Sequence, residues 1–74
     1  MIDLNEVACR DAVKSFKRLL TFLDGEPTKE QLGKITATLR AANYALDLNG
    51  DDIRTVQVVT RRINTLVDEF QTGA

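Results

Sequence analysis

The acidic run at residues 47–52 has side chains that could bind a metal ion. It reads Asp47-Leu48-Asn49-Gly50-Asp51-Asp52, and carboxylate and amide oxygens are the ligands that calcium prefers. A calcium-binding loop, however, has glycine at its sixth position and a bidentate glutamate at its twelfth. Counted from Asp47, the sixth residue is Asp52 and the twelfth is Val58. We therefore predict no metal site, and we expect these residues to end one helix and cap the next.

Side chains that commonly perform catalysis are scarce in this chain. There is no histidine, which removes the commonest general base. The single cysteine, Cys9, has no histidine to activate it and cannot form an intramolecular disulfide bond. Cys9 falls on the apolar side of the first helical segment, where we expect it to be a small buried core residue. The sequence therefore predicts a protein that is not an enzyme and holds no cofactor.

Basic residues gather on one side of each of two helical segments. The first segment carries Arg10, Lys14, Lys17 and Arg18, and the third carries Arg54, Arg61 and Arg62 around Val58. A solvated outer face explains both clusters. Because ten basic and eleven acidic residues leave a net charge of -1, nucleic-acid binding is disfavoured. A DNA-binding or DNA-mimicking regulator that uses the third helix remains the alternative.

Periodicity and capping signals predict three amphipathic helices in a single domain over residues 1–74. We place them at about residues 4–24, 29–48 and 52–71. Thr28 with Gln31 forms a capping box, Asp51 or Asp52 caps the third helix, and Gly25 follows the first in the left-handed conformation. The β-branched stretch IRTVQVVT would suit a strand, but its three-four spacing continues to Phe70 and favours a helix. The fold class is therefore all-α, a small helical bundle.

The second helical segment carries apolar residues on two nearly opposite sides. One stripe consists of Leu32, Ile35, Leu39, Ala42 and Leu46, and the other of Ala37, Ala41, Tyr44, Ala45 and Leu48. We therefore expect this helix to be central, sandwiched between other helices, and antiparallel to the first helix across a short loop. A chain of 74 residues without a disulfide gains from shared burial, so we also expect a homodimer.

These features favour a small non-enzymatic protein–protein interaction module, a regulator, adaptor or inhibitor that acts through a helical surface. The candidate partner-binding residues are Phe22, Tyr44 and Leu48 as apolar anchors, and Arg54, Val58, Arg61 and Arg62 around them. No apolar stretch approaches the roughly 20 residues that a membrane-spanning helix needs. The start of the chain also lacks the pattern of a signal peptide. We therefore expect a cytoplasmic protein with no membrane association.

Overall fold

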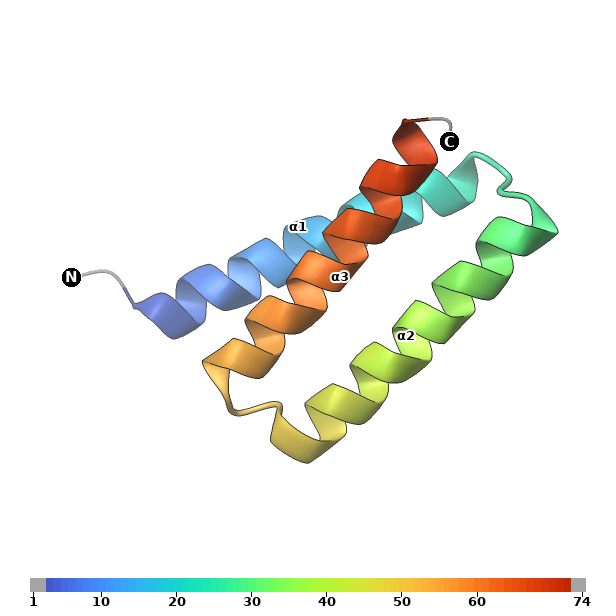
Figure 1. Ribbon diagram of the computed structural model, residues 1–74. Helices are drawn as coiled ribbons and strands as arrows, with labels where there is room; N and C mark the ends of the chain where they lie inside the picture. The colour runs from blue at the N-terminus through green and yellow to red at the C-terminus, as the bar shows by residue number, and fades with distance from the viewer. Residues whose placement is uncertain (1–2, 73–74) are drawn as a thin grey trace.

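The computed structural model describes residues 3–72, and Figure 1 shows three α-helices in this part of the chain. They are α1 (Leu4–Asp24), α2 (Lys29–Asn49) and α3 (Ile53–Gln71). The predicted bounds agree with these to within one residue, and the β-branched start of α3 is helical. The all-α prediction is confirmed, and the three helices pack as a small compact bundle.

The predicted caps explain why α2 and α3 begin where they do. The Gln31 backbone N–H donates to Thr28 Oγ1 at 3.2 Å, and the Thr28 backbone N–H donates to Gln31 Oε1 at 2.9 Å. This reciprocal pair is the expected capping box. At α3, the Arg54 backbone N–H donates to Asp52 Oδ1 at 2.9 Å. One residue of the acidic run therefore has a structural role as an N-cap.

The connection between α1 and α2 differs from the prediction at one residue. Gly25 has φ of -81°, whereas Glu26 has φ of 59° and is the residue in the left-handed region. The Gly25 N–H donates to the Phe22 carbonyl oxygen at 3.0 Å, which extends the right-handed turn by one residue. The chain therefore reverses at Glu26, where a side chain costs roughly 1 kcal/mol that glycine would avoid.

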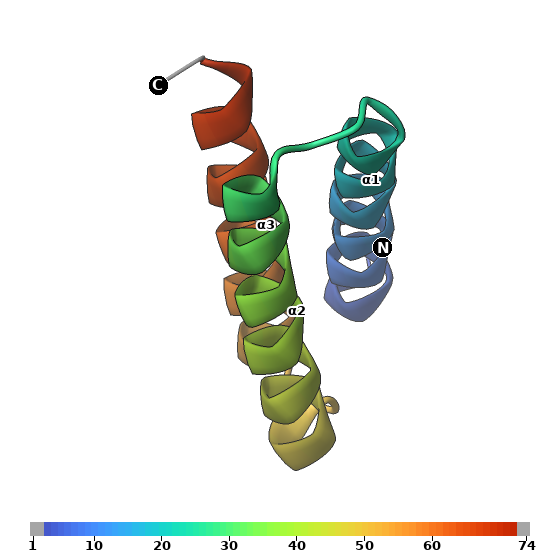
Figure 2. The ribbon, with the colours of Figure 1, turned by 90° about the vertical axis from the view of Figure 1, so that its right-hand side faces the viewer.

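The central helix of the bundle is α3. It packs against both other helices, whereas no Cα atom of α1 lies within 8 Å of a Cα atom of α2. Figure 2 shows α1 in one layer and α2 with α3 in the other. The shortest extent of the molecule, 19 Å, is about two helix diameters. The expectations that α2 is sandwiched and that α1 and α2 are neighbours are therefore wrong.

The buried apolar core shows why α3 takes the central place. Its members are Ala8 and Leu19 of α1, Ile35 and Ala42 of α2, and Val59, Ile63, Leu66 and Val67 of α3. Ile63 and Val67 have no exposed surface. The second stripe of α2 consists mainly of alanines, whose small side chains gain little from burial. The larger aliphatic side chains of α3 bury more apolar area, so α3 takes the position between the other two helices.

Helix α1 turns a different side to the bundle from the one that its apolar residues predict. Ala8, Ser15 and Leu19 are buried, whereas Cys9 is exposed and Leu20 is 59% exposed. The expectation that Cys9 is a buried core residue is therefore wrong. Small side chains on the contacting side allow close approach of the two helices, and Ser15 also finds a polar partner on α3. Close packing and the Ser15 hydrogen bond both favour the observed orientation of α1 about its own axis.

Candidate functional site

A mainly apolar groove lies along the junction of α2 and α3. Its volume is about 300 Å³, and its lining residues are Ala41, Ala42, Tyr44, Ala45, Val58, Val59 and Arg62. Ala42 and Val59 form a buried floor, while Tyr44 is 69% and Val58 49% exposed. We call these seven residues the α2/α3 groove. It has two large apolar side chains at its edges and small alanines between them.

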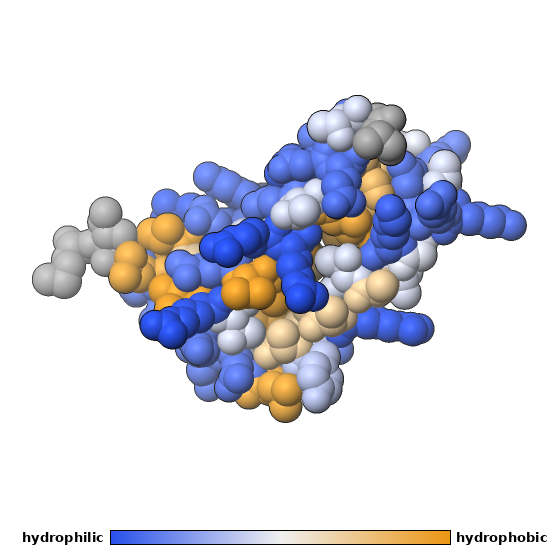
Figure 3. All heavy atoms as spheres, in the orientation of Figure 1, coloured by the Kyte–Doolittle hydropathy of each residue, from blue (hydrophilic) through white to orange (hydrophobic). Residues whose placement is uncertain are grey.

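The α2/α3 groove lies on a surface that combines apolar and basic side chains. Figure 3 shows apolar atoms along the junction of α2 and α3, with strongly hydrophilic side chains beside them. Alanines at positions 37, 41 and 45 keep the α2 side of this surface low, because each side chain is one methyl group. Another helix can therefore approach the α2 backbone closely here.

The structure brings some of the predicted partner-binding residues together and separates others. Tyr44, Val58 and Arg62 meet in the α2/α3 groove. Leu48 is 63% exposed and lies one helical turn beyond Tyr44 on α2. Arg54 is exposed one turn before Val58 on α3. These five residues therefore belong to one face of the α2–α3 pair.

Phe22 and Arg61 lie elsewhere. Phe22 is partly buried, and its ring stacks on that of Phe70 with centroids 4.8 Å apart. This contact joins α1 to α3 and belongs to the core. Arg61 lines a second, more polar hollow of about 510 Å³ between α1 and α3, with Asp11, Gln57 and Asn64 among its other residues. The adjacent arginines Arg61 and Arg62 therefore serve different surfaces.

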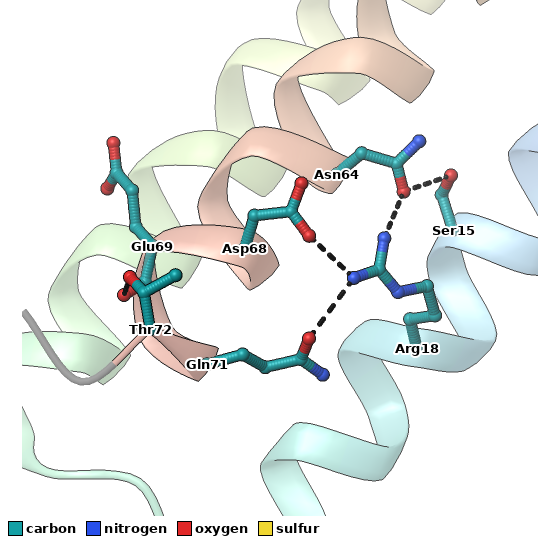
Figure 4. A network of polar contacts seen from close by, with 7 residues as sticks. All are labelled: Ser15, Arg18, Asn64, Asp68, Glu69, Gln71 and Thr72. Atoms are coloured by element: carbon teal, nitrogen blue, oxygen red, sulfur yellow. Dashed lines mark hydrogen bonds and ion pairs between the residues drawn. The ribbon is translucent and has the colours of Figure 1, made fainter.

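A network of polar contacts joins α1 to α3 beside this second hollow (Figure 4). The buried Ser15 hydroxyl donates to Asn64 Oδ1 at 2.9 Å, and Arg18 Nη1 donates to the same oxygen at 3.0 Å. Arg18 Nη2 donates to Asp68 Oδ1 at 2.7 Å and reaches Gln71 Oε1 at 3.4 Å. The prediction that Arg18 only faces solvent is therefore wrong, because its guanidinium group bridges two helices.

Replacing Asn64 with alanine is expected to lower the free energy of unfolding by about 1–2 kcal/mol. Arg18 loses one of its acceptors, and the Ser15 hydroxyl keeps only the Asp11 carbonyl oxygen within α1. The measurement is urea denaturation followed by circular dichroism. Gln57→Ala is the matched control, since Gln57 lines the same hollow but is exposed and its side chain forms no hydrogen bond that the structure describes. We expect it to change the free energy of unfolding by less than about 0.5 kcal/mol. Equal losses in the two variants would contradict a role for the network in stability.

The sequence contains one signal for the polar network between α1 and α3. Ser15 is a polar residue that interrupts an apolar stripe formed by Ala8, Ala12, Leu19 and Phe22 on its helix. A polar residue in such a place is buried only with a hydrogen-bond partner. Pairing Ser15 with Asn64 was not possible from sequence alone, because it requires knowing that α1 and α3 are neighbours. For the same reason, the sequence alone could not identify Ala42 and Val59 as the floor of the α2/α3 groove, because this requires knowing how α2 and α3 pack.

Groups of metal-ligand residues and membrane-spanning helices were both sought within the described residues. Across residues 3–72, no three His, Cys, Asp or Glu side chains converge as metal ligands would. None of the helices α1, α2 and α3 has the length and apolarity that a bilayer crossing requires. Comparisons with protein-family models, curated proteins and solved structures found no match to this chain. The assignment of the candidate site is therefore argued from the geometry of this structure.

Proposed function

We propose that this chain is a small non-enzymatic protein–protein interaction module that docks onto a partner protein through the α2/α3 groove. In this proposal it works in the cytoplasm as a regulator, adaptor or inhibitor that covers or presents a helical surface. Tyr44, Leu48 and Val58 supply the apolar contact area, and Arg62 supplies polar contacts at its edge.

The observation that supports this proposal is the exposure of three large apolar side chains on one face. Tyr44, Leu48 and Val58 are 69%, 63% and 49% exposed, and two of them line a groove whose other residues are mostly small. Single exposed apolar residues are ordinary on protein surfaces, but a cluster beside a concave apolar surface is typical of a binding site. Tyrosine and arginine are also enriched among residues that dominate binding energies.

The test is a capture experiment from the cells that make the protein, with the wild type and two variants as baits. Tyr44→Asp is expected to lose the partner, because it places a charge in the apolar contact. Leu20→Asp is the matched control, since Leu20 is also a large exposed apolar residue but lies on α1. The expected result is a specific protein retained by wild type and Leu20→Asp and lost by Tyr44→Asp. Equal recovery by all three baits would count against the groove as the docking site.

The alternative function, DNA binding through α3, is favoured by a different observation. Arg54, Arg61 and Arg62 are all exposed on α3, although Arg61 lies toward α1 and Arg62 toward α2. Phosphate contacts by these side chains would release counterions, so DNA affinity would fall steeply as salt increases. Titration of a short duplex at two salt concentrations distinguishes the two functions. Affinity that depends strongly on salt and on all three arginines would favour the DNA-binding alternative.

A further inference from the structure

The basic residues around the α2/α3 groove restrict the kind of partner that fits it. Arg62 lines the groove, Arg54 lies one turn from Val58, and Lys34 lies two turns before Ala41 on the same side of α2. Within residues 3–72, no carboxylate oxygen lies within 4.0 Å of these three cationic groups; the ion pairs there use Arg10 and Arg18. The three cations are therefore available to a ligand.

Acidic residues near this face lie at its two ends. Asp52 stands at the turn between α2 and α3 and accepts a backbone hydrogen bond as the N-cap of α3. Glu30 and Glu69 line a neighbouring hollow together with Lys34 at the other end. The middle of the face, around Tyr44 and Val58, therefore has Arg62 as its charged residue. An apolar centre with a cation in the middle is complementary to an apolar stripe flanked by carboxylates.

A second copy of this chain fits the α2/α3 groove poorly. A symmetric dimer brings the same surface of both copies together, so each Arg62 would face the basic side of the other copy. Like charges at an interface are destabilising. The expected homodimer remains a prediction, and it would need a surface other than this groove.

The length and shape of the face favour a helix as the docked segment. The exposed stripe from Ala37 to Leu48 extends over about 16 Å of α2 at 1.5 Å per residue, about three helical turns. The alanines at positions 37, 41 and 45 recur every four residues, which lets the side-chain ridges of an incoming helix pack against α2. A helix with apolar residues at the same spacing would cover Tyr44, Leu48 and Val58 together.

We propose that the α2/α3 groove binds an acidic amphipathic helix of a partner protein, with its apolar stripe against Tyr44, Leu48 and Val58 and its carboxylates near Arg62, Arg54 and Lys34. This inference rests on the proposed function and adds the chemistry of the partner segment. The apolar stripe supplies most of the contact area. The basic side chains of the face favour acidic helices over basic ones by charge.

The test is selection from a displayed library of amphipathic helical peptides. Each peptide keeps an apolar stripe at three- and four-residue spacing, and its flanking positions vary among Glu, Lys, Gln and Ala. With the wild-type protein as bait, we expect peptides with more Glu than Lys beside the stripe. Purified peptides from this selection should bind at least about tenfold more weakly to Arg62→Glu, which corresponds to a loss of about 1.4 kcal/mol. A Lys17→Glu bait is the matched control, because Lys17 is an exposed cation on α1, and it should bind like the wild type.

Three results would overturn the inference. They are selected peptides that are neutral or basic, selected peptides that bind Arg62→Glu as well as wild type, and no selected peptides at all. Displacement of the selected peptides by a short DNA duplex would instead assign the face to nucleic acid. A selection of neutral or basic helices that still depend on Tyr44 overturns only the assigned charge. Equal recovery by the wild-type and Tyr44→Asp baits from cells overturns the proposed function itself.

Discussion

Replacing Ile63 with alanine is expected to lower the free energy of unfolding by about 3–4 kcal/mol. Ile63 has no exposed surface and belongs to the core cluster to which all three helices contribute, so the cavity left by three missing carbon atoms cannot fill with solvent. Domains of this size are stable by roughly 4–11 kcal/mol. The melting temperature, followed by circular dichroism, should therefore fall by at least about 12 °C.

The control for this prediction is Val58→Ala on the same helix. Val58 is 49% exposed, so we expect a change of less than about 0.5 kcal/mol. If Ile63→Ala does not fold, Ile63→Val tests the same position, and we expect it to lower the free energy of unfolding by about 1 kcal/mol. Losses of the same size at positions 58 and 63 would contradict the assignment of Ile63 to the core and of Val58 to the surface of α3.

Replacing Ala41 with glutamate is expected to weaken binding of an acidic helix by more than about tenfold while leaving the free energy of unfolding within about 0.5 kcal/mol of the wild type. Ala41 is exposed and lines the α2/α3 groove. The longer side chain would occupy the space into which the partner docks. Its charge would also repel carboxylates on the incoming helix. Fluorescence anisotropy with a labelled peptide from the library selection measures the affinity.

Thr36→Glu is the matched control for Ala41→Glu. Thr36 is exposed on another side of α2 and does not line the groove. It adds the same charge to the same helix, so it separates a local effect from a change in net charge. We expect the affinity of Thr36→Glu to stay within about threefold of wild type. Equal weakening by the two variants would argue against direct docking at Ala41.

The three helices could be predicted from the sequence because their ends are determined by local interactions. Thr28 and Gln31 satisfy each other's backbone groups, and Asp52 caps α3. The order of packing could not be predicted in the same way. Both α2 and α3 have enough apolar residues to be central, and the choice depends on how much area each helix buries against the other two. Periodicity treats alanine and leucine on α2 as equal apolar positions, although alanine buries much less apolar area.

Only some of the residues proposed for partner binding lie together in the structure. Tyr44, Val58 and Arg62 were each identified as partner-binding candidates, and they meet in the α2/α3 groove. Phe22 was identified by the same reasoning, yet it stacks on Phe70 inside the bundle. Periodicity places a residue on a side of its own helix, but only the arrangement of neighbouring helices decides whether that side is covered.

A nuclear magnetic resonance titration tests most directly whether the outer face of α2 and α3 is a docking surface. The ¹⁵N-labelled protein is titrated with an acidic helical peptide from the selection, and shifts of backbone amide signals are mapped on the chain. We expect the largest shifts around Ala41, Tyr44 and Ala45 on α2 and around Val58 and Arg62 on α3, with α1 nearly unchanged. Largest shifts around Val13 and Leu20 of α1 would contradict this expectation.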